Sequence, residues 1–371
     1  MSNVDLFSNS SQPQQKPPGR RSKKKSFGKT LVIFIAVIAA IGLVAPQVAS
    51  RLSGAPDFPG PGSGSVQVQI ESGETLAQIG NSLKDLGVVA SVDGFIAAAN
   101  DNPDSGSIAP GLYNLLLEMK SSDAILALLN PENRVVTRVV IPEGKRVSWT
   151  INALATETGI PLADFEAAVA NANQLGLPDY AGGNAEGFLF PATYEFGPGA
   201  TADQMISEMI SRFNAEATSI NLEARAAEMG RSPYEIVIVA SLLEGEGQPR
   251  DFAKVARVVY NRLAEPMRLQ FDSAVNYGLG IADVLLTTEL LNTPTDYNVY
   301  LNDGLTPTPI NNPGGLALEA ALNPENGDWL YFITTNLLTT ETKFTQSYEE
   351  FLVFKDELLA FCDANSDVCY K

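Results

Sequence analysis

The feature that most constrains this chain is an uncharged apolar segment close to its N-terminus. Residues 30–49 contain no charged side chain, and every residue from Leu31 to Ala45 is apolar apart from Gly42. About 20 apolar residues are what a helix needs to cross the hydrocarbon core of a bilayer. The sequence therefore predicts a transmembrane helix over residues 30–50.

Charge on the two sides of this segment predicts its orientation. Seven basic residues precede Thr30, against one acidic residue, Asp5. The basic residues are Lys16, Arg20, Arg21, Lys23, Lys24, Lys25 and Lys29. By the positive-inside rule, residues 1–29 form a disordered cytoplasmic arm, and the rest of the chain lies outside the cytoplasm at the cell membrane. A cleaved signal peptide ending near Ala49 is the alternative, but the long polar leader and the long apolar run favour an anchor.

Beyond the anchor, the pattern predicts a linker and two folded domains. Residues 51–65 are rich in Pro, Gly and Ser, which is typical of a flexible linker. Residues 66–140 show strand and helix patterns of a small α+β module, and helical patterns dominate residues 141–371. Strands are expected at 66–70, 111–117, 134–141, 329–335 and 343–345. We therefore expect an α+β fold whose second domain is mostly helical.

Composition excludes several classes of function. Taking the charges of the arm from the totals of 25 Lys and Arg and 43 Asp and Glu leaves a net charge of −24 on the rest of the chain. So acidic a body repels nucleic acid, and no nucleic-acid partner is expected. The chain has no histidine, which excludes Ser-His-Asp and Cys-His nucleophiles and imidazole-bound zinc. No metal or other cofactor is expected, and acid–base chemistry falls to Asp, Glu, Lys or Tyr.

The two cysteines, Cys362 and Cys369, lie close together near the C-terminus. Outside the cytosol they can close a small disulfide loop, and two free thiols are the alternative. Neither cysteine belongs to a metal-binding or redox motif. They therefore predict a structural role at most.

One segment has the pattern of a buried helix that ends at a carboxyl group. Ser232 and Glu235 form a capping box with Pro233 at the first helical position. Residues 236–243 are apolar on nearly every side, which indicates burial. Glycines at 245 and 247 are expected to stop the helix, so Glu244 falls at its C-terminal end.

This position predicts that Glu244 holds its proton near neutral pH. Desolvation disfavours the ionised carboxylate, and the negative end of the helix dipole disfavours it further. A general acid needs such a raised pKa. The alternative is that Glu244 reaches solvent or pairs with Arg250 or Arg257.

Short motifs occur in a fixed order around Glu244, between about residues 66 and 355. They are Ile141-Pro142-Glu143-Gly144, Glu186 to Tyr194, Ala240 to Glu246, Met267 to Asp272, Tyr297 to Tyr300, Gly304 to Ile310 and Asn312 to Gly314. This ordered set resembles the MltG (YceG-like) family of endolytic murein transglycosylases. The resemblance implies a LysM-like module over residues 66–140 and a catalytic transglycosylase domain over residues 141–371.

In this family the catalytic acid lies in an Ala-Ser-x-x-Glu motif, which here ends at Glu244. The resemblance implies cleavage of the MurNAc–GlcNAc β-1,4 bond inside a nascent peptidoglycan strand. The C6 hydroxyl of MurNAc then closes onto C1 and leaves a 1,6-anhydroMurNAc end, so that one essential carboxyl suffices where ordinary glycosidases use two. Implied partners are glycan strands, the cytoplasmic membrane and, by family analogy, cell-wall synthases.

Other residues of the matched motifs are candidates for substrate binding. They are Gln270, Asp272, Tyr297, Asn298, Tyr300 and Glu246. Turn or core roles are the alternative for Tyr297 and Asn298. Three roles are open for Glu246: it assists Glu244, it raises the pKa of Glu244 by repulsion, or it caps a loop. For Glu186 and Asp272, the alternative is a structural role as buried carboxylates.

The chain departs from the family pattern at three places. Gly245 and Gly247 follow the catalytic Glu, where the family usually has basic or polar residues, and Thr306 stands where a proline is common. Lys343 precedes Phe344, where the family carries a histidine.

A non-catalytic wall-binding scaffold and a water-using muramidase are the alternative functions.

Overall fold

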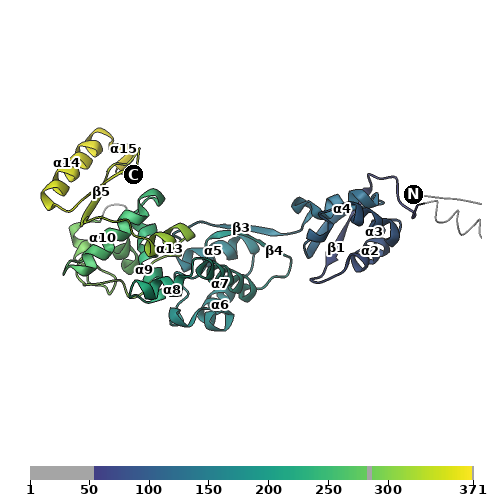
Figure 1. Cartoon of the computed structure of the whole chain (residues 1–371), viewed down its shortest axis with the longest axis horizontal. Coiled ribbons are helices and arrows are strands. Elements are labelled where there is room, and N and C mark those ends of the chain that lie inside the picture. Colours follow the sequence, from purple (N-terminus) through teal and green to yellow (C-terminus); the bar gives the residue numbers. More distant parts are fainter. Residues whose placement is uncertain (1–53, 282–285, 370–371) are drawn as a thin grey trace, which may run out of the picture. The chain divides into compact units, whose positions relative to one another are not determined.

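The computed structural model describes residues 54–281 and 286–369 (Figure 1). The basic arm and the segment predicted to cross the membrane lie outside the described residues. Within the two described ranges, no helix combines the length and the apolar character that crossing a bilayer requires.

The described chain is α+β and mostly helical, as expected, and its strands form small two-stranded sheets. The strands are β1 (Ser63–Ile70), β2 (Gly111–Leu117), β3 (Thr137–Ile141), β4 (Ala192–Phe196), β5 (Tyr331–Asn336) and β6 (Glu341–Thr345). The α-helices are α2 (Leu76–Asp85), α3 (Val92–Asp101), α4 (Ser121–Leu129), α5 (Val147–Thr158), α6 (Leu162–Ala170), α7 (Ala202–Ser219), α8 (Leu222–Glu228), α9 (Pro233–Glu246), α10 (Phe252–Ala264), α11 (Asp272–Leu279), α12 (Thr288–Leu291), α13 (Gly315–Leu322), α14 (Tyr348–Ala364) and α15 (Ser366–Cys369).

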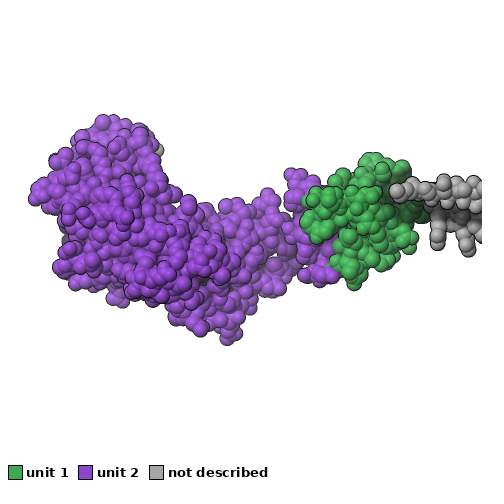
Figure 2. Space-filling model, viewed as in Figure 1, with its two compact units in different colours: residues 1–66, 74–107, 116–129 green, residues 67–73, 108–115, 130–371 purple. Residues whose placement is uncertain are grey.

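Two compact units make up the described chain (Figure 2). The smaller unit takes in residues 54–66, 74–107 and 116–129, and the larger one takes in the remainder. In the smaller unit, α2, α3 and α4 enclose a core in which Leu83 and Phe95 are fully buried.

Part of the expected linker belongs to the smaller unit. The Asp57 carboxylate accepts hydrogen bonds from the backbone N–H and the hydroxyl of Ser121, at 2.9 and 2.7 Å. The first of these bonds satisfies one N–H group of the first turn of α4, a turn whose N–H groups have no partner inside the helix. The chain is therefore ordered on this unit before β1 begins.

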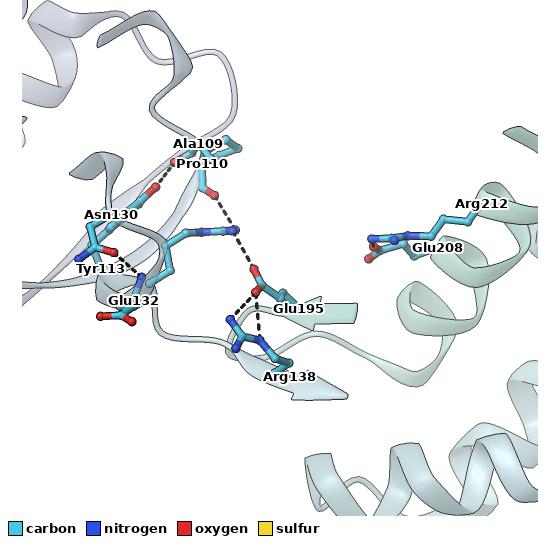
Figure 3. A network of polar contacts seen from close by, with 10 residues as sticks. Ala109, Pro110, Tyr113, Asn130, Glu132, Arg138, Glu195, Glu208 and Arg212 are labelled. Carbon is cyan, nitrogen blue, oxygen red and sulfur yellow. Dashed lines mark hydrogen bonds and ion pairs between the residues drawn. The ribbon is translucent and has the colours of Figure 1, made fainter. Parts of the chain in front are cut away.

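The larger unit contains β3 and β4, which pair antiparallel with Val139 opposite Tyr194. Glu195 of β4 forms ion pairs with Arg138 at 2.9 Å and with Arg134 at 3.3 Å, and Figure 3 shows its carboxylate beside Arg138. The sequence predicts a strand over residues 134–141, at the end of the small module, and no strand at β4. The structure instead joins the two strands inside the larger unit.

Helix α9 is the centre of the larger unit. It begins as predicted, with a reciprocal capping box between Ser232 and Glu235 and with Pro233 in the first turn. Residues 236–243 are all buried, because α8, α10, α11 and α13 pack around the helix. The apolar run in the sequence thus corresponds to a helix that is covered on every side.

The C-terminal part consists of the β5–β6 hairpin followed by α14 and α15. Both strands were expected near these positions, and they pair antiparallel with Phe332 opposite Phe344. Cys362 and Cys369 form a disulfide that joins α14 to α15. Of the two alternatives for the cysteines, the structure therefore has the disulfide.

Candidate active site

Glu244 lies in the last turn of α9, at the place that the sequence pattern predicts. The Gly247 N–H bonds to the Leu243 carbonyl oxygen at 2.9 Å and closes the helix. Glu244 is half-buried, whereas the eight residues before it are buried. Its carboxyl group is therefore at the boundary between core and surface.

One backbone donor binds this carboxyl group directly. The Gly314 N–H donates to Glu244 Oε1 at 2.9 Å, and Gly314 is the N-cap of α13. Gly144 approaches from another segment, since a β-carbon at Gly144 would lie 3.7 Å from the Glu244 Cβ. Between described residues, no hydrogen bond ends on Glu244 Oε2. That oxygen is the one available to a substrate.

Asn312 joins three of the motifs that carry the family resemblance. Its Oδ1 accepts hydrogen bonds from the N–H groups of Gly187 at 3.0 Å and Leu189 at 2.9 Å. Its Nδ2 donates to the Lys145 carbonyl oxygen at 2.8 Å, and its own carbonyl oxygen accepts from the Gly144 N–H at 2.9 Å. Asn312 is fully buried, so these bonds fix the three motifs to one another beside the end of α9.

Ser241 links α9 to the same loop, three residues before Glu244. Its hydroxyl donates to the Ile238 carbonyl oxygen at 2.7 Å and accepts from the Ile310 N–H at 3.1 Å. Its carbonyl oxygen accepts from Asn311 Nδ2 at 2.8 Å. Because the hydroxyl is completely buried and bonded on both sides, Ser241 positions the loop and does not reach substrate.

The electrostatics of Glu244 combine opposing effects. Burial raises the pKa of Glu244 to about 7, the Gly314 hydrogen bond opposes this increase, and the negative charge of Glu143 adds to it. The sequence predicts the burial and, of the helix dipoles near Glu244, only the unfavourable C-terminal dipole of α9. The N-terminus of α13 also faces the carboxylate, and its dipole stabilises negative charge. At neutral pH both protonation states are consequently accessible, as reversible proton transfer requires.

Glu246 lies two residues further on and has different contacts. Its Oε1 accepts hydrogen bonds from the backbone N–H and the hydroxyl of Ser273, in the first turn of α11. Burial raises the pKa of Glu246 to about 7, and the Ser273 bonds oppose the increase. Of the three roles left open for Glu246, these contacts are those of a cap.

The structure brings Gln270, Asp272 and Tyr300 together. The Tyr300 hydroxyl donates to Asp272 Oδ1 at 2.6 Å, and burial together with this bond raises the pKa of Tyr300 above its usual range. The Gln270 N–H donates to the Val299 carbonyl oxygen at 3.1 Å. Gln270 has a φ of +54°, a region that non-glycine residues seldom adopt, and its side chain is exposed.

Tyr297 and Asn298 have the contacts of the turn alternative. Asn298 is fully buried, and its Nδ2 donates to the carbonyl oxygens of Leu291 and Thr293 at 3.0 and 2.8 Å. The Tyr297 hydroxyl lies 2.9 Å from the Thr308 hydroxyl. Direct substrate contact by this pair stays a prediction.

Glu186 is a further buried carboxyl in the larger unit, with 7% of its surface exposed. Its Oε1 accepts from the Val147 N–H at 2.9 Å, and its Oε2 accepts from the Tyr277 hydroxyl at 3.2 Å. Burial raises the pKa of Glu186 to about 7, while these two bonds and the charge of Arg146 oppose the increase. Both oxygens are occupied, so Glu186 ties α5 to α11.

Neither Asn312 nor Gly314 is among the candidate residues that the sequence indicates, although both lie in a matched motif. A β-carbon at Gly314 would lie 2.0 Å from Glu143 Oε1, so the Glu143 side chain packs directly over this glycine. Lys343, where the family has a histidine, forms an ion pair with Glu357 of α14. Among the residues that the structure describes, no cluster of His, Cys, Asp or Glu is arranged to hold a metal ion.

Comparison with curated proteins identifies relatives in two bacteria. The chain is 31% identical over 314 residues to the endolytic murein transglycosylase of Bacillus subtilis, covering 80% of this chain and 85% of the relative. It is 28% identical over 352 residues to the protein of the same name from Streptococcus pneumoniae, covering 84% of this chain and 61% of that relative.

A solved structure and a family match agree with these relatives. The crystal structure of a yceG-like protein from Listeria monocytogenes is similar with a TM-score of 0.52 at 28% identity, covering 78% of this chain and 98% of that one. Residues 68–357 match the YceG-like family. The match spans well over half of the sequence, so this chain belongs to the YceG-like family.

Proposed function

We propose that this protein is an endolytic lytic transglycosylase that cuts peptidoglycan between MurNAc and GlcNAc, with Glu244 as its catalytic acid. Relatives named endolytic murein transglycosylase support the substrate class and the type of reaction. The observation that carries the proposal is the environment of Glu244: a half-buried carboxyl, with a pKa of about 7 and one oxygen without a hydrogen-bond partner among the described residues.

The proposed reaction needs one proton donor and no water. Glu244 gives its proton to the glycosidic oxygen as the bond from that oxygen to C1 of MurNAc breaks. The C6 hydroxyl oxygen of the same MurNAc then bonds to C1, and its proton passes to the Glu244 carboxylate. The enzyme regains its starting protonation state, and the products are a new GlcNAc hydroxyl and a 1,6-anhydroMurNAc end.

The Gly314 N–H has a role in the middle of this cycle. Within this cycle, Glu244 carries a negative charge between giving up one proton and receiving the next. The hydrogen bond of 2.9 Å from Gly314 and the N-terminal dipole of α13 stabilise the carboxylate during that interval. General acid–base catalysis of this kind contributes about 10²- to 10⁴-fold to a rate.

Mass spectrometry of muropeptides tests the proposal. The full-length protein in detergent is incubated with uncrosslinked glycan strands, beside Glu244→Gln and a control, Glu157→Gln, which makes the same chemical change at an exposed position on α5. The wild type and the control are expected to release fragments with anhydro ends, and Glu244→Gln is expected to release none.

Other outcomes favour the alternatives. Reducing MurNAc ends, heavier than anhydro ends by one water, would identify a muramidase. Glycan binding by all three proteins without new chain ends would favour a scaffold. Anhydro ends from Glu244→Gln at the wild-type rate would remove Glu244 from the mechanism.

We further propose that residues 30–50 anchor the enzyme in the cytoplasmic membrane, with the domain from 141 onward outside the cytoplasm. Proteins that extend the glycan strand are then its neighbours, and the module over 66–140, which we propose is LysM-like, contacts the strand. Support comes from the uncharged apolar run and the basic arm before it. Edman sequencing of the membrane-bound protein is expected to find the arm intact, whereas a mature N-terminus at Arg51 would identify a cleaved signal.

A further inference from the structure

An exposed tryptophan follows the segment that touches Glu244, since Trp149 comes five residues after Gly144. Trp149 is in the first turn of α5, and 42% of its surface is exposed. An exposed aromatic side chain offers a ligand a rigid contact surface at low entropic cost.

Lys145 lies beside this ring. Its Nζ is 5.2 Å from the centroid of the Trp149 ring. None of the ion pairs between described residues includes Lys145, although Glu143 is only two residues away. In a chain with a formal net charge of −18, an uncompensated ammonium at this position favours an anionic ligand.

The backbone that carries these two side chains is fixed against Glu244. The Lys145 carbonyl oxygen accepts hydrogen bonds from both the N–H and the Nδ2 of Asn312, at 3.0 and 2.8 Å. Gly144, the preceding residue, is in contact range of Glu244, and consecutive Cα atoms are only about 3.8 Å apart. Lys145 is therefore next in sequence to a residue within contact range of the proposed catalytic acid.

Apolar surface is also exposed on the other segment that touches Glu244. Leu316 follows Gly314 by two residues, at the start of α13, and 63% of its surface is exposed. Both segments that contact the carboxyl group thus present an apolar side chain at the surface. Sugar rings have apolar C–H faces that such surfaces cover.

We infer that Trp149 and Lys145 form a carbohydrate subsite beside Glu244, in which a sugar ring covers the indole and the ammonium binds a carboxylate carried by MurNAc. That carboxylate belongs to the lactyl group or to the peptide attached to it. The inference rests on the proposed function for the identity of the glycan. The inferred subsite would distinguish strands that contain MurNAc from a GlcNAc polymer, because a GlcNAc polymer carries no carboxylate for Lys145 to bind.

Tryptophan fluorescence tests the contact with the ring. The chain has two tryptophans, so Trp329→Phe leaves Trp149 as the only one. In the full-length Glu244→Gln, Trp329→Phe protein, added MurNAc–GlcNAc strands are expected to change the emission and to protect it from a soluble quencher. The matched protein with Trp149→Phe and Trp329 retained is expected to respond little. An unchanged Trp149 emission at saturating glycan would overturn the inference.

Kinetics separate binding from folding. With Glu244 intact, Trp149→Ala is expected to raise KM about tenfold with kcat nearly unchanged, because it removes binding that is equal in ground and transition states. Trp149→Phe is expected to recover part of the loss. Equal KM for Trp149→Ala and the wild type, or a loss confined to kcat and thermal stability, would contradict a subsite.

The role of Lys145 is tested with two probes. Strands stripped by an amidase keep a lactyl carboxylate on each MurNAc, whereas a GlcNAc oligomer is neutral. Lys145→Met is expected to weaken binding of the stripped strands about threefold at low salt and less at high salt, with no effect on the neutral oligomer. Equal weakening for both probes would show that Lys145 does not bind the carboxylate.

The results distinguish failure of this inference from failure of the proposed function. Anhydro products together with an unresponsive Trp149 would leave the function standing and remove the subsite. Quenching of Trp149 by glycan without any anhydro product would leave the subsite standing and remove the lytic reaction.

Discussion

The surroundings of Glu244, which is half-buried, and of Glu186, which is buried, show how two carboxyl groups with similarly raised pKa values differ in their contacts. Burial raises the pKa of each to about 7. Glu186 has both oxygens engaged, one by the Val147 N–H and one by the Tyr277 hydroxyl. Glu244 has a single donor, the Gly314 N–H.

This difference shows that a displaced pKa does not identify a catalytic acid by itself. Structural networks perturb pKa values as well as active sites do. The nearby charges also differ, since Glu143 raises the pKa of Glu244 and Arg146 lowers that of Glu186. What separates the two groups is the oxygen of Glu244 that remains available for a proton transfer.

The largest expected difference between the two carboxyls is in turnover. Glu244→Gln is expected to lower kcat by at least about 10³-fold, because the amide cannot donate an acidic proton. Glu186→Gln is expected to lower kcat less than about tenfold, because the amide keeps an acceptor for the Val147 N–H. Initial rates of anhydro-end formation measure both, and equal losses would break the comparison.

The sequence predicts those features that depend on contacts between residues close together in the chain, and not those that depend on contacts between distant residues. Helix α9, its capping box and the position of Glu244 follow from residues within one short segment, so they are readable from the pattern. The pairing of β3 with β4 joins residues more than 50 positions apart, and no local pattern indicated β4.

The contacts that define the site are equally non-local. Asn312 bonds to Gly187 and Lys145, and Gly314 bonds to Glu244 from 70 residues away. The ordered motifs indicated that these segments belong together, but not which atoms meet. The second dipole at Glu244 was missed for this reason, because it comes from a helix that starts after Gly314.

The next largest effect is expected on stability. Glu186→Ala leaves the Val147 N–H and the Tyr277 hydroxyl without their acceptor in a buried place. Each unsatisfied group costs about 1–3 kcal/mol, so the free energy of unfolding is expected to fall by roughly 2–6 kcal/mol in urea titrations. Glu157→Ala, at an exposed position, is expected to change it by less than about 0.5 kcal/mol. A similarly small change for Glu186→Ala would show that the two bonds are unimportant.

The pH dependence of stability sharpens the comparison further. Since the folded pKa of Glu186 lies above the ordinary value of 4.5, the folded state binds more protons than the unfolded state between about pH 4.5 and 7. The stability this group contributes is complete below that window and is lost as the pH rises through it. Between pH 5 and pH 7.5, the unfolding free energy of the wild type is expected to fall by roughly 1–3 kcal/mol more than that of Glu186→Gln, because the glutamine cannot ionise. Parallel curves for the two proteins would contradict the raised pKa.

The smallest effect is expected from the charges near the two carboxyl groups. Glu244 has the negative charge of Glu143 nearby, whereas Glu186 has the positive charge of Arg146. Glu143→Gln removes a negative charge that raises the pKa of Glu244, so the carboxyl ionises at lower pH. The proposed reaction begins with protonated Glu244, so the falling limb of the pH–rate profile near pH 7 is expected to move to lower pH. The displacement is expected to be less than about half a unit, because Glu143 is exposed and its charge is screened by solvent. The displacement is expected to shrink as salt is added, whereas a change in hydrogen bonding would be insensitive to salt. A limb that moves to higher pH would mean that Glu143 acts on the substrate and not through the charge of Glu244.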